Sequence, residues 1–190
     1  MRVLNLSTST LFRAQGISLF WLAKGDSQKK KMTSTVTHLR LIINQALPLL
    51  QAISDGQASI KPNPGKWSQK EIIGHLIDSA ANNHQKFVRA MESDKIDFPA
   101  YQQDEWVRLQ QYNMVAWDQL LQLWQVYNLH LAHIMDAVPE ESLQHQLYIS
   151  GKGPFTLEFI LNDYTEHLKH HLNAILPEAE LLTNKFQMVY

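Results

Sequence analysis

The histidines are the residues of this chain that could carry chemistry most directly. The 190-residue sequence contains nine of them and no cysteine. The absence of cysteine excludes disulfide bridges, thiolate zinc sites, iron–sulfur ligation and a protein thiol nucleophile. A metal site in this chain must therefore be built from imidazoles, carboxylates and water.

Two histidines near the end of the chain are spaced to share one metal ion. The segment 157–176 has an apolar stripe of helical period, formed by Leu157, Ile160, Leu161, Tyr164, Leu168, Leu172 and Ile175. At about 100° per residue, His171 lies roughly 45° and His167 roughly 85° from the centre of this stripe, whereas His170 lies roughly 145° away and should face solvent. His167 and His171 are one turn apart, so both imidazoles can point at one cation. Two histidines are fewer than the usual three protein ligands, and the alternative is a boundary histidine that only hydrogen bonds to a neighbour.

His75 is the candidate third ligand, although periodicity alone does not favour it. It shares one side of its predicted helix with Glu71, Asp78 and Asn82, away from the apolar stripe. The simplest interpretation is a solvated polar face. The alternative is a strip that lines an open cleft, where Asp78 and Asn82 would orient ligands or substrate. The other histidines are expected to be exposed, in loops, or buried with a hydrogen-bond partner: His38, His84, His130, His133, His145 and His170.

Four amphipathic segments must position these side chains. Apolar residues recur with a helical period over residues 34–54, 68–92, 114–137 and 157–176. Residues 147–149 suggest a short extended piece, and no segment predicts a clear strand. Helices of roughly 20 residues have to bury their apolar stripes against one another, so the sequence predicts an all-α four-helix bundle.

The ends of these helices carry recognisable signals. Ser68 and Glu71 form a capping box, in which each side chain can bond the backbone amide of the other residue. Asn113 is expected to cap the third helix, and Pro139 to follow its end. Pro48 lies inside the first helical segment, where the missing backbone donor should kink or split the helix.

The first 31 residues differ in composition from the rest of the chain. Residues 1–31 hold six basic side chains and one acidic side chain, a balance of +5, whereas residues 32–190 hold 11 and 17, a balance of −6. Early arginines, serines and threonines are features of a targeting peptide, but the best apolar stretch, residues 17–23, is short for a signal peptide. We therefore expect an N-terminal extension, 1–31, outside a domain that spans 32–190. The extension would form at most a short helix that packs Leu11, Phe12, Phe20 and Trp21 on the domain.

Charge and hydropathy exclude several classes of partner. The formal net charge of the whole chain is −1, which gives no reason to expect nucleic-acid binding. No apolar run approaches the roughly 18 residues of a membrane span, so no membrane partner is expected. These features favour a cytoplasmic protein that acts on, or binds, a small molecule.

Four motifs occur in order along the chain. They are Trp67-Ser68-x-x-Glu71-x-x-x-His75-Leu76, Asp78-Ser79-Ala80-Ala81-Asn82-Asn83, Tyr101-Gln102-Gln103-Asp104-Glu105-Trp106 and Asp163-Tyr164-x-x-His167-x-x-His170-His171-Leu172. This ordered set resembles the DinB/YfiT-like family (DinB superfamily) of four-helix metalloproteins over roughly residues 33–176. The resemblance implies an up-down-down-up bundle with a three-histidine site for a divalent cation such as nickel, zinc or iron. Carried over by position, the metal ligands are His75, His167 and His171.

The same resemblance implies a reaction on a small molecule. Family members with an assigned activity include thiol-dependent S-transferases and isomerases, and others are described as metal-dependent hydrolases. Because this chain has no cysteine, the thiol of a transferase would be an external low-molecular-weight thiol. The alternatives are a non-catalytic bundle that binds a metal or small thiol, and a structural or dimerisation bundle with a vestigial site; a homodimer would be the commonest assembly. Tyr101, Asp104 and Trp106 would form a loop over the site or pack that loop on the bundle.

Overall fold

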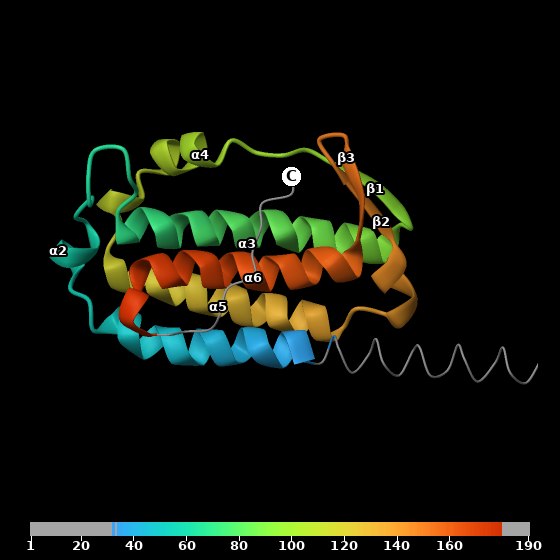
Figure 1. Ribbon diagram of the computed structural model, residues 1–190, viewed down its shortest axis with the longest axis horizontal. Coiled ribbons are helices and arrows are strands. Elements are labelled where there is room, and N and C mark those ends of the chain that lie inside the picture. The colour runs from blue at the N-terminus through green and yellow to red at the C-terminus, as the bar shows by residue number, and fades with distance from the viewer. Residues whose placement is uncertain (1–31, 33, 180–190) are drawn as a thin grey trace, which may run out of the picture.

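Four long helices lie side by side in the computed structural model (Figure 1). The structure describes residue 32 and residues 34–179. Residues 34–51 form the first helix, and the others are α3 (Gln69–Glu92), α5 (Trp117–Asp136) and α6 (Leu157–Ile175). The prediction of an all-α four-helix bundle is therefore confirmed. The short helix expected within residues 1–31 lies outside the described residues.

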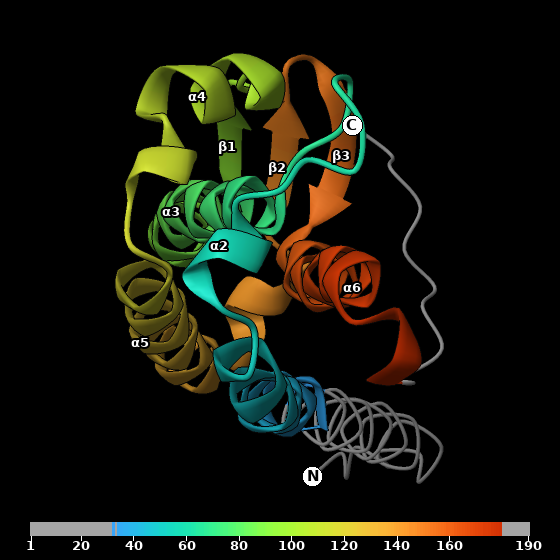
Figure 2. The ribbon, with the colours of Figure 1, turned by 90° about the vertical axis from the view of Figure 1, so that its left-hand side faces the viewer.

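The four helices follow an up-down-down-up order. In Figure 1 the first helix and α6 run from right to left, whereas α3 and α5 run from left to right. Because α3 and α5 are parallel, the chain between them has to return along the bundle. This return carries β1 (Lys95–Phe98) and α4 (Gln103–Gln110), and Figure 2 shows both over α3, on the side away from the first helix.

A small three-stranded sheet lies at one end of this return segment. Its order is β1, β2 (Gln146–Ile149), β3 (Lys152–Thr156), with β1 parallel to β2 and β2 antiparallel to β3. The turn between β2 and β3 has positive φ angles at Ser150 and Gly151, the conformation of a tight hairpin turn. The expected extended piece at residues 147–149 lies in β2, whereas β1 and β3 were not predicted because such short strands show little apolar alternation.

The apolar stripes of the long helices meet in one core. Its largest fully buried side chains include Trp117, Trp124, Tyr164, Phe87, Leu39, Ile42 and Leu121. This packing supplies most of the stability of such helices, since helix propensity alone is weak. In the part of the chain that the structure describes, no helix combines the length and the apolar character needed to cross a membrane.

The structure corrects two expectations about helix ends. The first helix continues through Pro48 to residue 51, so of the two effects expected of the proline, a kink or a split, the split does not occur. The N-cap residue of the third long helix, α5, is Ala116 and not Asn113. Asn113 lies in the preceding 3₁₀ helix, η1 (Tyr112–Met114), and its side-chain oxygen accepts a hydrogen bond of 2.6 Å from Oγ of Ser68. That hydrogen bond occupies the group that would have capped a helix.

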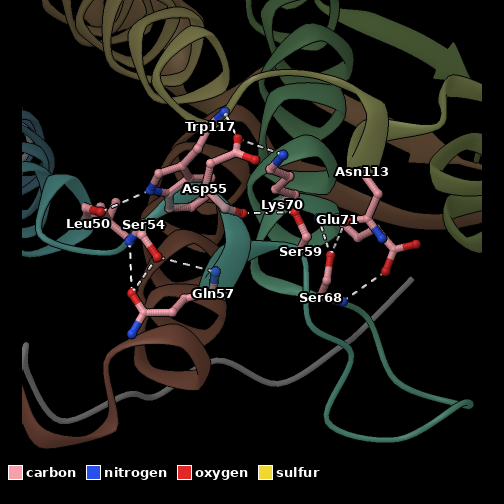
Figure 3. A network of polar contacts seen from close by, with 10 residues as sticks. All are labelled: Leu50, Ser54, Asp55, Gln57, Ser59, Ser68, Lys70, Glu71, Asn113 and Trp117. Carbon is pink, nitrogen blue, oxygen red and sulfur yellow. Dashed lines mark hydrogen bonds and ion pairs between the residues drawn. The ribbon is translucent and has the colours of Figure 1, made fainter.

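The predicted capping box starts α3. Oγ of Ser68 accepts a hydrogen bond from the backbone amide of Glu71, and Oε2 of Glu71 accepts one of 2.8 Å from the backbone amide of Ser68 (Figure 3). The other carboxylate oxygen of Glu71 pairs with Nζ of Lys61 at 2.7 Å. The N-terminal turn of α3 is thus bonded to itself, to η1 and to the loop before it. This turn directly precedes the turn that carries His75.

A second polar contact links α3 to α5 through the short helix α2 (Asp55–Ala58). Oδ1 of Asp55 accepts a hydrogen bond of 2.8 Å from the backbone amide of Trp117 and pairs at 2.7 Å with Nζ of Lys70 (Figure 3). The indole of Trp117 donates to the backbone oxygen of Leu50 at the end of the first helix. One carboxylate therefore connects the starts of two long helices.

Candidate metal centre

Three histidines from two helices converge between α3 and α6. Nε2 of His75 lies 3.2 Å from Nε2 of His167, which lies 3.1 Å from Nε2 of His171. One ligand atom from each residue lies within 4.8 Å of the others. Within residues 32 and 34–179, no other group of three or more histidine, aspartate or glutamate side chains meets this criterion. The structure thus brings together the three residues that the resemblance singled out.

The interpretation of His75 as part of a solvated polar face is wrong. Its side chain is 1% exposed, and every residue from 73 to 80 is buried. The helical-wheel argument assumed that only one side of this helix is covered. In the structure α5 and α6 pack against α3 while α4 and η1 lie over its remaining side, so even the polar side of this stretch is enclosed.

Trp67 forms one wall of the histidine cluster. It precedes the first residue of the capping box, and its ring centroid lies 4.9 Å from that of His75 and 6.3 Å from that of His171. The indole is half-buried. It therefore places an apolar surface over two of the three imidazoles and limits their access to water.

Burial keeps the three imidazoles neutral. It lowers the pKa of His75 to about 4 and, together with the neighbouring histidines, the pKa of His171 to about 3. The pKa of His167 is also lowered well below its usual value, first by burial and then by His171 and His75. At pH 7 all three rings are therefore in the deprotonated form that binds metal.

The geometry of the three nitrogens fits a divalent cation. Two metal–nitrogen bonds of about 2.0–2.1 Å at a tetrahedral angle place their nitrogens about 3.3–3.4 Å apart. The observed separations of 3.1 and 3.2 Å are close to this value. A neutral imidazole has one N–H, so three converging Nε2 atoms cannot all find a donor among themselves. A single cation would satisfy the three lone pairs together.

Comparison with known proteins identifies the family and the fold of this chain. The family model of the DinB superfamily matches residues 38–175. The chain belongs to the DinB superfamily. Its similarity to the solved structure described as "YfiT from Bacillus subtilis is a probable metal-dependent hydrolase with an unusual four-helix bundle topology" covers 80% of this chain and 86% of that one. The TM-score is 0.68 at 20% identity, which shows a shared fold.

Relatives of this DinB-superfamily chain carry names that refer to a metal. A protein of Geobacillus thermodenitrificans, named "Putative metal-dependent hydrolase", is 22% identical over 125 residues, which cover 65% of this chain and 70% of the relative. "Putative metal-dependent hydrolase YfiT" of Bacillus subtilis is 22% identical over 149 residues, covering 78% and 82% of the two chains.

Asp78 does not join the histidines in this DinB-superfamily protein. It is 4% exposed, and its Oδ1 accepts hydrogen bonds of 2.7 Å from the hydroxyl of Tyr112 and from Nε2 of Gln110. Burial raises the pKa of this carboxyl, and the two hydrogen bonds oppose the shift. The expectation that Asp78 is solvated is therefore wrong. Its contacts attach α4 and η1 to α3 beside His75.

The segment expected as a loop over the site is largely helical. Asp104 and Trp106 are exposed residues of α4, whereas Tyr101 is partly buried, and its ring centroid lies 4.8 Å from that of Trp106. Burial, and then the charge of Asp78, raise the pKa of the Tyr101 phenol. Tyr101 is therefore the least exposed member of this trio.

Ser79 is a site residue that sequence reasoning missed. Its Oγ lies 3.3 Å from Nδ1 of His167, the ring nitrogen that does not face the other histidines. A hydroxyl that accepts from Nδ1–H leaves Nε2 unprotonated and free to bind a cation. The signal was present in the sequence, because Ser79 follows His75 by one helical turn and so lies on the same face.

The remaining histidines do not belong to the group of three, although the ring centroid of His170 lies 5.1 Å from that of His171. His170 is exposed, as its angle from the apolar stripe predicted, and His133 and His130 are exposed on α5. Nδ1 of His84 lies 3.3 Å from the hydroxyl of Tyr127, and Nδ1 of His145 lies 2.6 Å from the backbone oxygen of Ala90. These positions match the roles expected for them.

Proposed function

We propose that this protein is a metal-dependent enzyme that acts on a small molecule, with His75, His167 and His171 as the ligands of one divalent cation. The observation that carries the proposal is the convergence of three neutral imidazoles, with Nε2 of His167 lying 3.2 Å from that of His75 and 3.1 Å from that of His171. The relatives named as metal-dependent hydrolases support it. Nickel, zinc and iron all accept imidazole ligands, and the donor set does not select one of them.

The charge of the ligand set favours an anion as the next ligand. No carboxylate of the described residues belongs to the cluster, so three neutral imidazoles would leave the positive charge of the cation uncompensated. A divalent cation in such a site lowers the pKa of coordinated water toward about 7 and stabilises a thiol as its thiolate. Ser79 orients His167, and Trp67 restricts water beside His75 and His171.

Hydrolysis of a small molecule is the reaction class that we put first, because coordinated water supplies the nucleophile. Transfer to or from an external low-molecular-weight thiol is the second candidate. It is favoured by the same uncompensated charge and is compatible with a chain that has no thiol of its own. The experiments below test these two reactions against two alternatives, non-catalytic metal binding and a vestigial site.

Elemental analysis of the purified full chain, free of any affinity tag, tests the proposal. After reconstitution with zinc, nickel or cobalt and removal of excess metal, we expect about one ion per chain, as a three-histidine site implies. His75→Ala, His167→Ala and His171→Ala should each lose the ion. His133→Ala, which removes an exposed histidine of α5, should retain it.

A wild-type protein without metal would contradict the proposal, as would equal loss of metal in the His133→Ala control. The cobalt form then separates the remaining alternatives. Visible spectra that change when azide or a small thiol is added indicate an exchangeable ligand position. Spectra that stay unchanged after both additions indicate a closed, non-catalytic metal site.

A further inference from the structure

A second group of histidines lies where α3 and α5 pack against each other (Figure 2). His84 of α3 is half-buried, and His130 and His133 of α5 are exposed. His84 follows His75 by nine residues, which at about 100° per residue places it on the opposite side of α3. This group is therefore separate from the three histidines between α3 and α6, and the two groups share no residue.

His84 and His130 repeat the arrangement of two rings in the candidate metal centre. Their ring centroids lie 5.3 Å apart, and their ring planes make an angle of 75°. The corresponding values for His75 and His167 are 5.1 Å and 73°. Because His84 and His130 belong to different helices, a cation bound by both rings would link α3 to α5.

Tyr127 orients the ring of His84. Nδ1 of His84 lies 3.3 Å from the hydroxyl of Tyr127, the same separation as between Nδ1 of His167 and Oγ of Ser79. A hydroxyl that accepts from Nδ1–H leaves Nε2 unprotonated, and histidines that bind metal usually have such a partner. Burial, and then the charge of His130, lower the pKa of His84, which favours the neutral ring. His84 is thus prepared to bind a cation through Nε2.

His133 supplies the third imidazole. It follows His130 by three residues, a spacing that places two side chains next to each other on a helix. The two rings are stacked, with centroids 6.3 Å apart and an angle of 27° between their planes, so their nitrogens do not yet converge. Both side chains are exposed, and exposed side chains change rotamer within nanoseconds. A rotation of His133 therefore suffices to complete a set of three ligands.

The surroundings of these rings carry little positive charge. Helix α5 contains no lysine or arginine. On α3, the residues one turn before and after His84 are uncharged: Ala80, Ala81, Phe87 and Val88. No cationic side chain at these positions would repel a bound metal ion.

We propose that His84, His130 and His133 form a second site for a divalent transition-metal ion, such as zinc, nickel or copper, on the outside of the bundle. Imidazole is a preferred ligand of these ions. The ion should bind at least about 100-fold more weakly than at His75, His167 and His171, because two exposed side chains have to be immobilised. Removing excess metal before elemental analysis should therefore remove it.

Calorimetric titration of zinc into the full chain, free of any affinity tag, tests this site at neutral pH. We expect two binding steps, the weaker of which corresponds to about one ion per chain, as one site of three histidines implies. His84→Ala, His130→Ala and His133→Ala should each weaken this step at least about tenfold and leave the tight step unchanged. Tyr127→Phe should weaken it about 10–100-fold, since the orienting contact is lost.

His38→Ala is the matched control. His38 is half-buried like His84, but it lies on the first helix and belongs to neither group, so both binding steps should stay unchanged. His130 and His133 are exposed, and their variants should fold as the wild type does. If His84→Ala does not fold, as judged by circular dichroism, His84→Gln replaces it.

Two results would overturn the second site: a wild type without the weaker step, or a weaker step that is unchanged in any one of the three histidine variants. The inference does not rest on the proposed function. A wild type that shows the weaker step but no tight step would overturn the proposed function and support the second site.

Discussion

Nε2 of His75 lies 3.2 Å from Nε2 of His167, although 92 residues separate them in the chain. The contact joins the second turn of α3 to the middle of α6. Two neutral imidazoles have no charge attraction that would hold them together, so the helix packing around them imposes the distance. A cation shared by both rings would bind the folded chain much more tightly than the unfolded one, in which the ligands are dispersed.

Metal should therefore stabilise the fold. At a free zinc concentration of about 100 times the dissociation constant, the free energy of unfolding should rise by about 2.7 kcal/mol, since binding to the native state adds to stability by mass action. Thermal unfolding with zinc and then with a chelator measures the effect. His171→Ala should show no shift. A wild-type melting temperature that changes with neither zinc nor chelator would support the alternative of a structural bundle with a vestigial site.

The metal-free protein should lose stability as the pH falls below the ordinary histidine range. The pKa of His75 is lowered from 6.5 to about 4, so the unfolded chain binds a proton near pH 6.5 while the native chain does not. Stability is then complete above pH 6.5 and decreases as the pH falls toward 4, by up to about 1.4 kcal/mol per pH unit for each such histidine. Urea unfolding across this range measures the slope.

The control for this pH dependence is an exposed histidine. His75→Gln should reduce the slope, because one proton-binding site of the unfolded chain is removed while the native chain loses no titrating group in this range. His133→Gln, on the exposed side of α5, should reduce it less. Equal slopes in the two variants would show that burial of His75 does not control the acid response.

Ser79→Ala should weaken metal binding without unfolding the protein. The hydroxyl lies 3.3 Å from Nδ1 of His167, and loss of such an orienting contact typically lowers metal affinity about 10–100-fold. Competition with a zinc chelator of known affinity measures the change. Ser34→Ala, at an exposed position of the first helix, serves as the control. Unchanged affinity in Ser79→Ala would mean that packing alone orients the ring.

The part of the site that could be predicted from residues alone lies on one helix. His167 and His171 are one turn apart at the edge of a single apolar stripe, so angles within α6 select them over His170. The position of His75 depends on the segments that cover α3, which periodicity does not describe. For His75 the family resemblance predicted a metal ligand, whereas the helical wheel favoured a solvated position.

The same distinction explains what was missed in the fold. The long helices can be predicted from apolar residues that recur with a helical period. β1 and α4 are short and mostly exposed, so they show no such pattern. Their conformation follows from pairing with β2 and from contacts with α3, which are made far along the sequence.

Gly74→Ala should destabilise the protein beside the metal site. A Cβ at this position would lie 2.0 Å from the ring of Tyr112, so the ring or α3 has to move. Overpacking of this kind costs about 1–3 kcal/mol. Gly56→Ala in α2 is the matched control, because a Cβ there meets no atom within 4 Å. Chemical denaturation of both variants gives the comparison, and equal stability would show that Tyr112 is not firmly packed.

Asp55→Ala should destabilise the fold more than the loss of an ordinary surface ion pair. Lys70 is buried, and its Nζ pairs with Oδ1 of Asp55 at 2.7 Å. The substitution would leave this ammonium and the backbone amide of Trp117 without their acceptor. Glu105→Ala, which removes the exposed ion pair with Arg108, should have little effect. Urea unfolding of the two variants at neutral pH compares them directly.

The contribution of Asp55 should also disappear in acid. The hydrogen bonds that the Asp55 carboxylate accepts, first from Lys70 and then from the backbone amide of Trp117, lower its pKa below the ordinary value of 3.8. A lowered native pKa means that the stabilisation is complete above pH 3.8 and is lost as the pH falls further. The difference in unfolding free energy between the wild type and Asp55→Ala should therefore shrink in strong acid. A difference that is constant with pH would show that the carboxylate charge does not hold α2 between α3 and α5.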